Sequence, residues 1–183
     1  MSGTTISSYG TVGVQLTAVS QNPVTVTSTG TIDTATGNTI YGSNADAWTI
    51  SSTGTIRSTA PGQNGVFLKQ GGTVANGASG ATGALISGAF SGVTIGRASG
   101  AVINYGTIMN TGPSGLAIDL AHGGSIVNGA TNATGALMSG AVDAVAISGA
   151  PGTVANYGTL GGTATEGVFL FNRLRKFAEI LSV

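Results

Sequence analysis

The residues able to do acid–base or metal chemistry are few and widely spaced in this chain. Its 183 residues include no cysteine and one histidine, so thiol catalysis and thiolate metal sites are excluded. Polysaccharide lyases and hydrolases need clustered carboxylates beside the reacting bond, with a base or a metal ion nearby. The carboxylates available for such a cluster are Asp33, Asp46, Asp119, Asp143, Glu166 and Glu179.

The spacing of these carboxylates does not favour catalysis. Asp143 and Glu166 precede equivalent apolar segments one repeat apart, which places them at one corner with no basic partner in register. Asp119 and His122 are the one acid–histidine pair of the sequence, and no motif places a nucleophile beside them. We therefore predict solvated turns at the acidic residues, no enzyme activity, no catalytic residue, no metal site and no cofactor.

Composition narrows the class of protein further. Only 7% of residues are charged and the formal net charge is zero, against roughly 25% charged residues in average soluble domains. The sequence shows no basic patch in its body, which argues against a nucleic-acid partner. Gly, Ser, Thr and Asn interrupt every apolar run, so no segment reaches the ~20 apolar residues of a transmembrane helix. The opening residues, MSGTTISSYG, have neither a basic nor an apolar region, so no export signal is expected in them.

The chain contains an internal duplication. Residues 72–108 and 124–160 align without gaps, 52 positions apart, and 21 of the 37 aligned positions are identical. Each copy divides into shorter units, in which a phrase such as GVFL is followed by one such as TVAN and closed by GTI or GAL. Six units run from about residue 13 to residue 166, with an incomplete unit before them and GVFLF beginning a seventh.

Each unit therefore holds three short β-type segments separated by turns. Three strands and three turns in roughly 25 residues describe one coil of a parallel β-helix. A single coil can neither bury its apolar face nor pair its backbone, whereas a second coil stacked about 4.8 Å away satisfies both needs. We predict an all-β parallel β-helix of about six three-stranded coils over residues 1–171.

Equivalent apolar residues of successive coils should stack into inward-facing columns, for which β-branched side chains are well suited. The first phrase predicts a column of Val14, Val66, Val93, Leu116 and Val145. The closing phrase predicts a column of Ile32, Ile56, Leu85, Ile108, Leu137 and Leu160. The middle phrase predicts a column of Val74, Val102, Ile126 and Val154.

A repeated asparagine comes two residues after the middle column. We predict a ladder in which each side-chain amide bonds its neighbours along the stack and satisfies the backbone of a turn. Its members are Asn76, Asn104, Asn128 and Asn156, with Ser28 and Ser52 at this place in the first two coils. The alternative is that asparagine merely tolerates the turn conformation.

The sequence changes character at its end. Residues 172–183, NRLRKFAEILSV, contain no glycine, and Leu174, Phe177 and Leu181 continue from Leu170 at the spacing of one helical face. We predict a C-terminal amphipathic helix over residues 172–183 that caps the last coil, because an open sheet edge invites self-association. A basic amphipathic helix lying on a membrane surface is the alternative.

The segments GVFLKQGGTVANG, GVTIGRASGAVINYGTI and AVAISGAPGTVANYGTL resemble the passenger regions of bacterial autotransporters and related β-strand-repeat surface proteins. The resemblance covers roughly residues 9–171. It implies a right-handed β-helix displayed on, or released from, a bacterial surface and acting in adhesion. The sequence departs from that family in having no export signal and no membrane barrel after the repeats.

Three functions follow as expectations. The leading one is a non-enzymatic extracellular structural or adhesive module that binds a surface polysaccharide or a partner protein. The outward aromatic residues are expected to cover hydrophobic corners, with stacking on sugars or on a partner surface as the alternative. They are Phe67 and Phe169 on an outer face and Trp48, Tyr105 and Tyr157 beside strands. The second is a filament subunit that binds its own kind through an open N-terminal edge. The third, which the short turns disfavour, is a polysaccharide-active enzyme.

Overall fold

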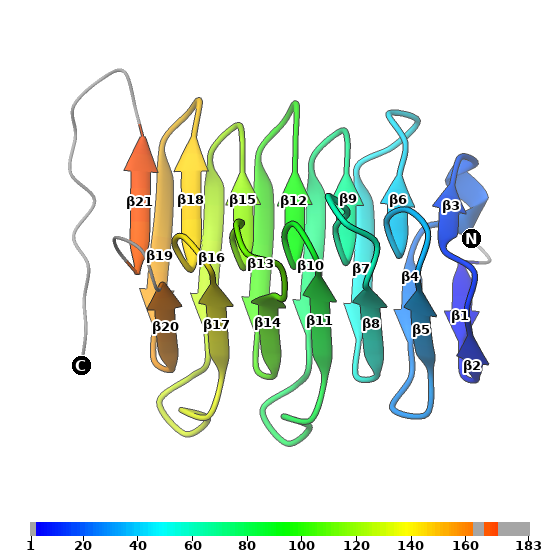
Figure 1. The fold of residues 1–183 in the computed structure, drawn as a ribbon, viewed down its shortest axis with the longest axis horizontal. Helices are drawn as coiled ribbons and strands as arrows, with labels where there is room; N and C mark the ends of the chain where they lie inside the picture. The colour runs from blue at the N-terminus through cyan, green and yellow to red at the C-terminus, as the bar shows by residue number, and fades with distance from the viewer. Residues whose placement is uncertain (1–2, 163–166, 172–183) are drawn as a thin grey trace.

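The computed structural model describes residues 3–162 and 167–171, which form an all-β parallel solenoid. Three parallel sheets of seven strands each run along its axis, so six turns separate the first and last strands of each sheet (Figure 1). Each coil contributes one strand to every sheet, and the winding has the right-handed-like sense usual for parallel crossovers. The prediction of a parallel solenoid of about six coils is confirmed.

The strands of each sheet are spaced one coil apart in the chain. Sheet A contains β1 (Thr4–Ile6), β4 (Val24–Val26), β7 (Trp48–Ser52), β10 (Gly72–Asn76), β13 (Gly100–Asn104), β16 (Gly124–Asn128) and β19 (Gly152–Asn156). Sheet B contains β2 (Tyr9–Gly10), β5 (Thr31–Thr34), β8 (Thr55–Ser58), β11 (Leu85–Gly88), β14 (Thr107–Asn110), β17 (Leu137–Gly140) and β20 (Thr159–Gly162). Sheet C contains β3 (Val14–Leu16), β6 (Ile40–Gly42), β9 (Val66–Leu68), β12 (Val93–Ile95), β15 (Ile118–Leu120), β18 (Val145–Ser148) and β21 (Val168–Phe171).

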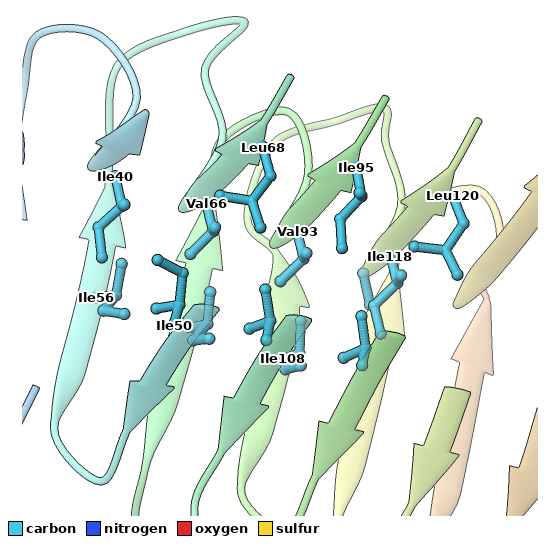
Figure 2. Packing of buried hydrophobic residues seen from close by; sticks show 14 of the residues in the cluster. Ile40, Ile50, Ile56, Val66, Leu68, Val93, Ile95, Ile108, Ile118 and Leu120 are labelled. Atoms are coloured by element: carbon cyan, nitrogen blue, oxygen red, sulfur yellow. The ribbon is translucent and has the colours of Figure 1, made fainter. Parts of the chain in front are cut away.

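Aliphatic side chains from all three sheets fill the interior. Figure 2 shows Ile50, Ile56 and Ile108 meeting the valine, isoleucine and leucine side chains that sheet C directs inward. The predicted column of sheet A is confirmed, because Val74, Val102, Ile126 and Val154 are consecutive register partners. Burial of these columns supplies the main stabilisation, at about 25 cal/mol per Å² of apolar surface removed from water.

The predicted column of sheet B is wrong at two positions. Ile86 and Met138, not Leu85 and Leu137, lie in register with Ile108 and are fully buried. Side chains alternate between the two faces of a strand, so a shift by one residue exchanges the inner and outer sets. The shift arises because Leu85 and Leu137 follow longer corners than Ile108 does.

The predicted column of sheet C is wrong at one position. Ile118, not Leu116, is the register partner of Val93 and Val145, and Leu116 is half-buried before the strand begins. The segment GLAIDL contains two overlapping apolar alternations, L-A-I and I-D-L, and the ladder hydrogen bonds select the second.

One large and one small residue share the corner between sheets C and A in several coils. Leu68 ends β9 and Gly72 begins β10, where a Cβ on Gly72 would lie 3.0 Å from Cδ1 of Leu68. Ile95 and Gly100 repeat the arrangement in the next coil, with 2.8 Å between the corresponding atoms. Gly72 is also required by its φ of 133° and by the backbone oxygen of Trp48, which an added Cβ would overlap, whereas at Gly100 the side chains of the core leave no room.

From β7 onward, the corner between sheets A and B alternates between a connection of two residues and one of eight. After β10 and β16 the chain makes a larger loop with an antiparallel bridge, between Ala78 and Ala81 in the first and between Ala130 and Ala133 in the second. These two loops project beyond the other corners at the lower edge of Figure 1. The corners after β13 and β19 are short. This alternation makes two coils, not one, the unit of the 52-residue duplication.

The helical content is small in the part that the structure describes. It consists of one 3-10 helix, Val19–Gln21, and no helix there is long and apolar enough to cross a membrane. The predicted capping helix, with Leu174, Phe177 and Leu181, lies outside the described residues. Leu170, which the helical spacing includes, belongs to strand β21.

Candidate functional site: an axial trough beside a basic corner

The structure brings the four predicted ladder asparagines together. They are consecutive register partners at the end of their strands in sheet A, although 28, 24 and 28 residues separate them in the chain. Asn76 Nδ2 donates to Oδ1 of Asn104 at 2.8 Å, Asn104 to Asn128 at 2.9 Å, and Asn128 to Asn156 at 2.9 Å. The first three side chains are fully buried.

Three of the four ladder amides also cross the corner to sheet B. The Nδ2 groups of Asn76, Asn104 and Asn128 donate to the carbonyl oxygens that open the sheet-B strands of the next coil, at 3.0, 3.1 and 3.1 Å. In the preceding coils this register position is held by Ser52 and Val26, so the expectation of Ser28 there is wrong. The arrangement fixes the angle between two sheets along the axis.

A second polar column, at the corner between sheets B and C, was not predicted from the sequence. Thr34 and Ser58 are register partners whose hydroxyls donate to the carbonyls of Thr36 and Gly37. Asn110, two coils further on, donates to the carbonyl of Phe90 at 2.7 Å. Its signal in the sequence is the polar residue two places after the closing apolar residue in TIDT, TIRS and TIMN.

The described carboxylates, Asp33, Asp46, Asp119 and Asp143, belong to different strands and corners. Asp33 forms an ion pair with Arg57, its register partner on the outer face of sheet B, and this contact raises the pKa of the guanidinium. Asp46 accepts a hydrogen bond from Nδ2 of Asn22 at 2.8 Å. Asp143, expected in a solvated turn, is buried instead. Residues 3–162 and 167–171 contain no group of three or more His, Asp or Glu side chains able to hold a metal ion.

Asp119 belongs to strand β15, and His122 to the corner that directly follows it. Asp119 faces outward on β15, between Thr94 and Ala146 of the adjoining strands, and burial raises the pKa of its carboxyl group. His122 is exposed on the corner that follows the strand. Glu166 and Glu179 lie outside the described residues, so the expected proximity of Asp143 and Glu166 stays a prediction.

Of the described aromatic residues, Phe67 and Phe90 lie at the surface, whereas Trp48 lies in the core. Phe67 faces outward on sheet C, as expected, and packs edge-on against Tyr41 with 5.7 Å between ring centroids. Trp48, expected at the surface beside a strand, is fully buried in the core. Phe90, at the corner between sheets B and C, is 45% exposed beside a depression of about 530 Å³ between Pro61 and Pro113.

An open trough runs along the axis of the solenoid on sheet A, with a volume of about 520 Å³. Its floor comes from the first two residues of β10, β13 and β16, so Thr73, Ala101 and Ser125 follow one another in register. Ser99 lines it from the corner between sheets C and A. Consecutive floor residues are one strand spacing, about 4.8 Å, apart.

The same corner carries the basic residues of three consecutive coils. Lys69 directly follows Leu68, whereas Arg97 and His122 come two residues after Ile95 and Leu120. Because those three strand ends are register partners, the basic residues gather along one edge of the solenoid. Arg97 and His122 are exposed and Lys69 is half-exposed.

Arg97 has a backbone conformation that arginine rarely adopts. Its φ is 60°, and the N–H of Ala98 donates to the carbonyl of Gly96 at 2.8 Å across it. In the duplicated coil the same turn contains Gly149, with φ of 76° and the Ala150–Ser148 hydrogen bond at 2.9 Å. The left-handed region costs a non-glycine residue about 1–2 kcal/mol, so Arg97 occupies a position that suits glycine.

The site combines two cationic side chains with hydroxyl groups along a shallow floor. In comparisons with known proteins, no family model matches the chain, and no curated protein or solved structure matches it either.

Proposed function

We propose that the chain is a non-enzymatic adhesive and structural module, a rigid rod displayed on or released from a bacterial surface. The observation that carries the proposal is the in-register repetition of outward side chains along all three sheets, which gives an extended contact surface. Such a surface suits a broad partner contacted at many points, because weak contacts that repeat along a rod add together. The resemblance of the repeat phrases to autotransporter passengers supports the surface location.

The outer surface of sheet A illustrates this property. Its two outward rows consist of Thr, Ser, Ala, Val and Ile, and no charged side chain belongs to them in the described strands. Outward rows of this kind are flat and closely spaced, because neighbouring strands are about 4.8 Å apart. A flat, nearly uncharged face suits contact with a repetitive surface more than enclosure of a small substrate.

Adhesion can be measured with beads that carry the folded chain. We expect these beads to bind bacterial cells or their extracellular matrix, and beads that carry an Ile86→Asp variant, whose core is disrupted, not to bind. Incubation of the chain with acidic and neutral polysaccharides, with and without calcium, should release no new reducing ends. Release of reducing ends would show an enzyme, and equal binding by the two kinds of bead would reject a specific adhesive surface.

A second candidate function is self-assembly into a filament. Strands β1, β2 and β3 are the outer strands of their sheets, and no described strand pairs with their free edges. Free edges of parallel sheets are templates for another strand. Sedimentation velocity over a concentration series tests this candidate, since a filament subunit must form larger species as its concentration rises.

A further inference from the structure

We propose that the axial trough and the basic corner together bind a linear anionic polysaccharide, whose chain lies parallel to the solenoid axis with its carboxylates on Lys69 and Arg97. This inference rests on the proposed adhesive function and deepens it by naming the chemistry of the surface that is bound.

The cationic side chains beside the trough support an anionic ligand. Lys69 and Arg97 have no ion-pair partner within the described part of the chain, where the one ion pair joins Arg57 to Asp33. They stand at the same corner of two consecutive coils, and Asp46, at this corner of the coil before, accepts hydrogen bonds from Asn22 and from the N–H of Ala47. Cations that gather beside a trough without carboxylate partners attract an anionic ligand.

The unusual backbone conformation of Arg97 also supports a binding role for its side chain. The duplicated coil shows that glycine fills the same turn, so the fold itself does not call for arginine at this place. Strained residues persist where they have a use, and such an outlier supports a functional assignment. A guanidinium held on an exposed turn can receive a carboxylate with two parallel hydrogen bonds.

The floor of the trough defines the ligand class. It offers the hydroxyls of Thr73, Ser99 and Ser125, and its lining contains no aromatic side chain. Single-stranded nucleic acids are held largely by stacking on aromatic rings, so the trough suits them poorly. A polyuronate carries a carboxylate on every sugar and hydroxyls between them, and therefore matches both the basic corner and the hydroxyl floor.

Binding of polygalacturonate to the full chain, measured by isothermal titration calorimetry, tests the assignment. We expect binding that weakens as salt is added, because exposed charges are screened. Replacing Arg97 by glycine should weaken it about tenfold or more, while the melting temperature stays the same or rises. Loss of affinity without loss of stability separates a binding role from a structural one. The Arg57→Gln variant, which removes a cation from sheet B, should bind as the wild type does.

The position of the ligand is tested on strand β13. Ala101→Tyr fills the trough and should abolish binding, whereas Ile103→Tyr, on the same face of the strand but outside the lining residues, should leave it unchanged. Equal affinity of the wild type and Arg97→Gly, absence of polygalacturonate binding, or tighter binding of single-stranded DNA would each overturn the inference. If polygalacturonate fails while coated beads still adhere, only this assignment is lost; if the beads also fail, the adhesive function is lost with it.

Discussion

Gly42 and Trp48 share one corner of the core, and the absence of a side chain at the first makes room for the indole of the second. A Cβ on Gly42 would overlap Cδ1 of Trp48 and lie 3.0 Å from its Cγ. Gly42 is the register partner of Leu68, and Trp48 that of Gly72. The second coil therefore places the small residue before the corner and the large one after it, the reverse of the next coil.

This exchange predicts that the effects of substitutions at Gly42 and Trp48 on the unfolding free energy are strongly coupled. Trp48→Gly should cost about 3–5 kcal/mol of unfolding free energy through the cavity it leaves, and Gly42→Leu about 1–3 kcal/mol or more through overpacking. The double variant restores the order found in the third coil, so its cost should fall short of the sum by about 1 kcal/mol or more. Urea unfolding measures all three variants. Trp48→Gly combined with Gly83→Leu, at a position with no atom near the added Cβ, should be additive.

The asparagine ladder should stabilise the solenoid most at its centre. Asn104 Oδ1 accepts from Asn76, and its Nδ2 reaches Asn128 and the carbonyl of Gly106. Asn104→Ala leaves these buried groups without partners and should cost about 2–3 kcal/mol. Asn156→Ala, at the half-buried end of the ladder, should cost about 1 kcal/mol. Equal losses in denaturant unfolding would contradict a cooperative ladder.

The ladder can be extended by one coil. Ser52 Oγ and Asn76 Oδ1 occupy neighbouring register positions, and both are buried without a hydrogen-bond partner. Ser52→Asn supplies a donor to Asn76, and we expect it to raise stability by about 1 kcal/mol. Ser51→Asn, at the exposed neighbouring position, is the matched control and should change stability little. A destabilised Ser52→Asn variant would show that this corner has no room for the amide.

The raised pKa of Asp119 predicts a pH-dependent contribution to stability. Burial disfavours its charged form, so the folded protein binds this proton more tightly than the unfolded chain does. The contribution of Asp119 is therefore unfavourable at neutral pH and disappears as the pH falls below its ordinary value near 3.8. Asp119→Asn should melt at a higher temperature than the wild type at pH 7, with a smaller difference in acid. A difference that is independent of pH would contradict this.

The sequence was sufficient for the fold because the physical demands of a coil repeat in it. Val74, Val102 and Ile126 show the alternation and spacing that stacking needs, and glycine marks the corners. The residue of each strand that faces the core was harder to predict from the sequence. Leu85 and Ile86 are adjacent and both apolar, so only the length of the preceding loop decides which one faces the core.

The candidate site could not be predicted from the sequence for a related reason. Lys69 and His122 occupy different positions in two corners of equal length, LKQGG and LAHGG, and Arg97 lies in a corner that is one residue longer, IGRASG. Their common position emerges only when the strand ends before them are placed in register. Trp48 was misplaced because no other coil has a large residue at the start of its sheet-A strand, so the repeat contained no precedent for it.

The alternation of long and short corners also limits which duplications and deletions of coils the fold can accept. Losing or copying a single coil would bring two like corners together, whereas a pair of coils can be removed or added with every neighbour conserved. Tandem copying would therefore lengthen the molecule in steps of about 10 Å, twice the strand spacing. The length of the solenoid could therefore change by inheritance while every interior contact is kept.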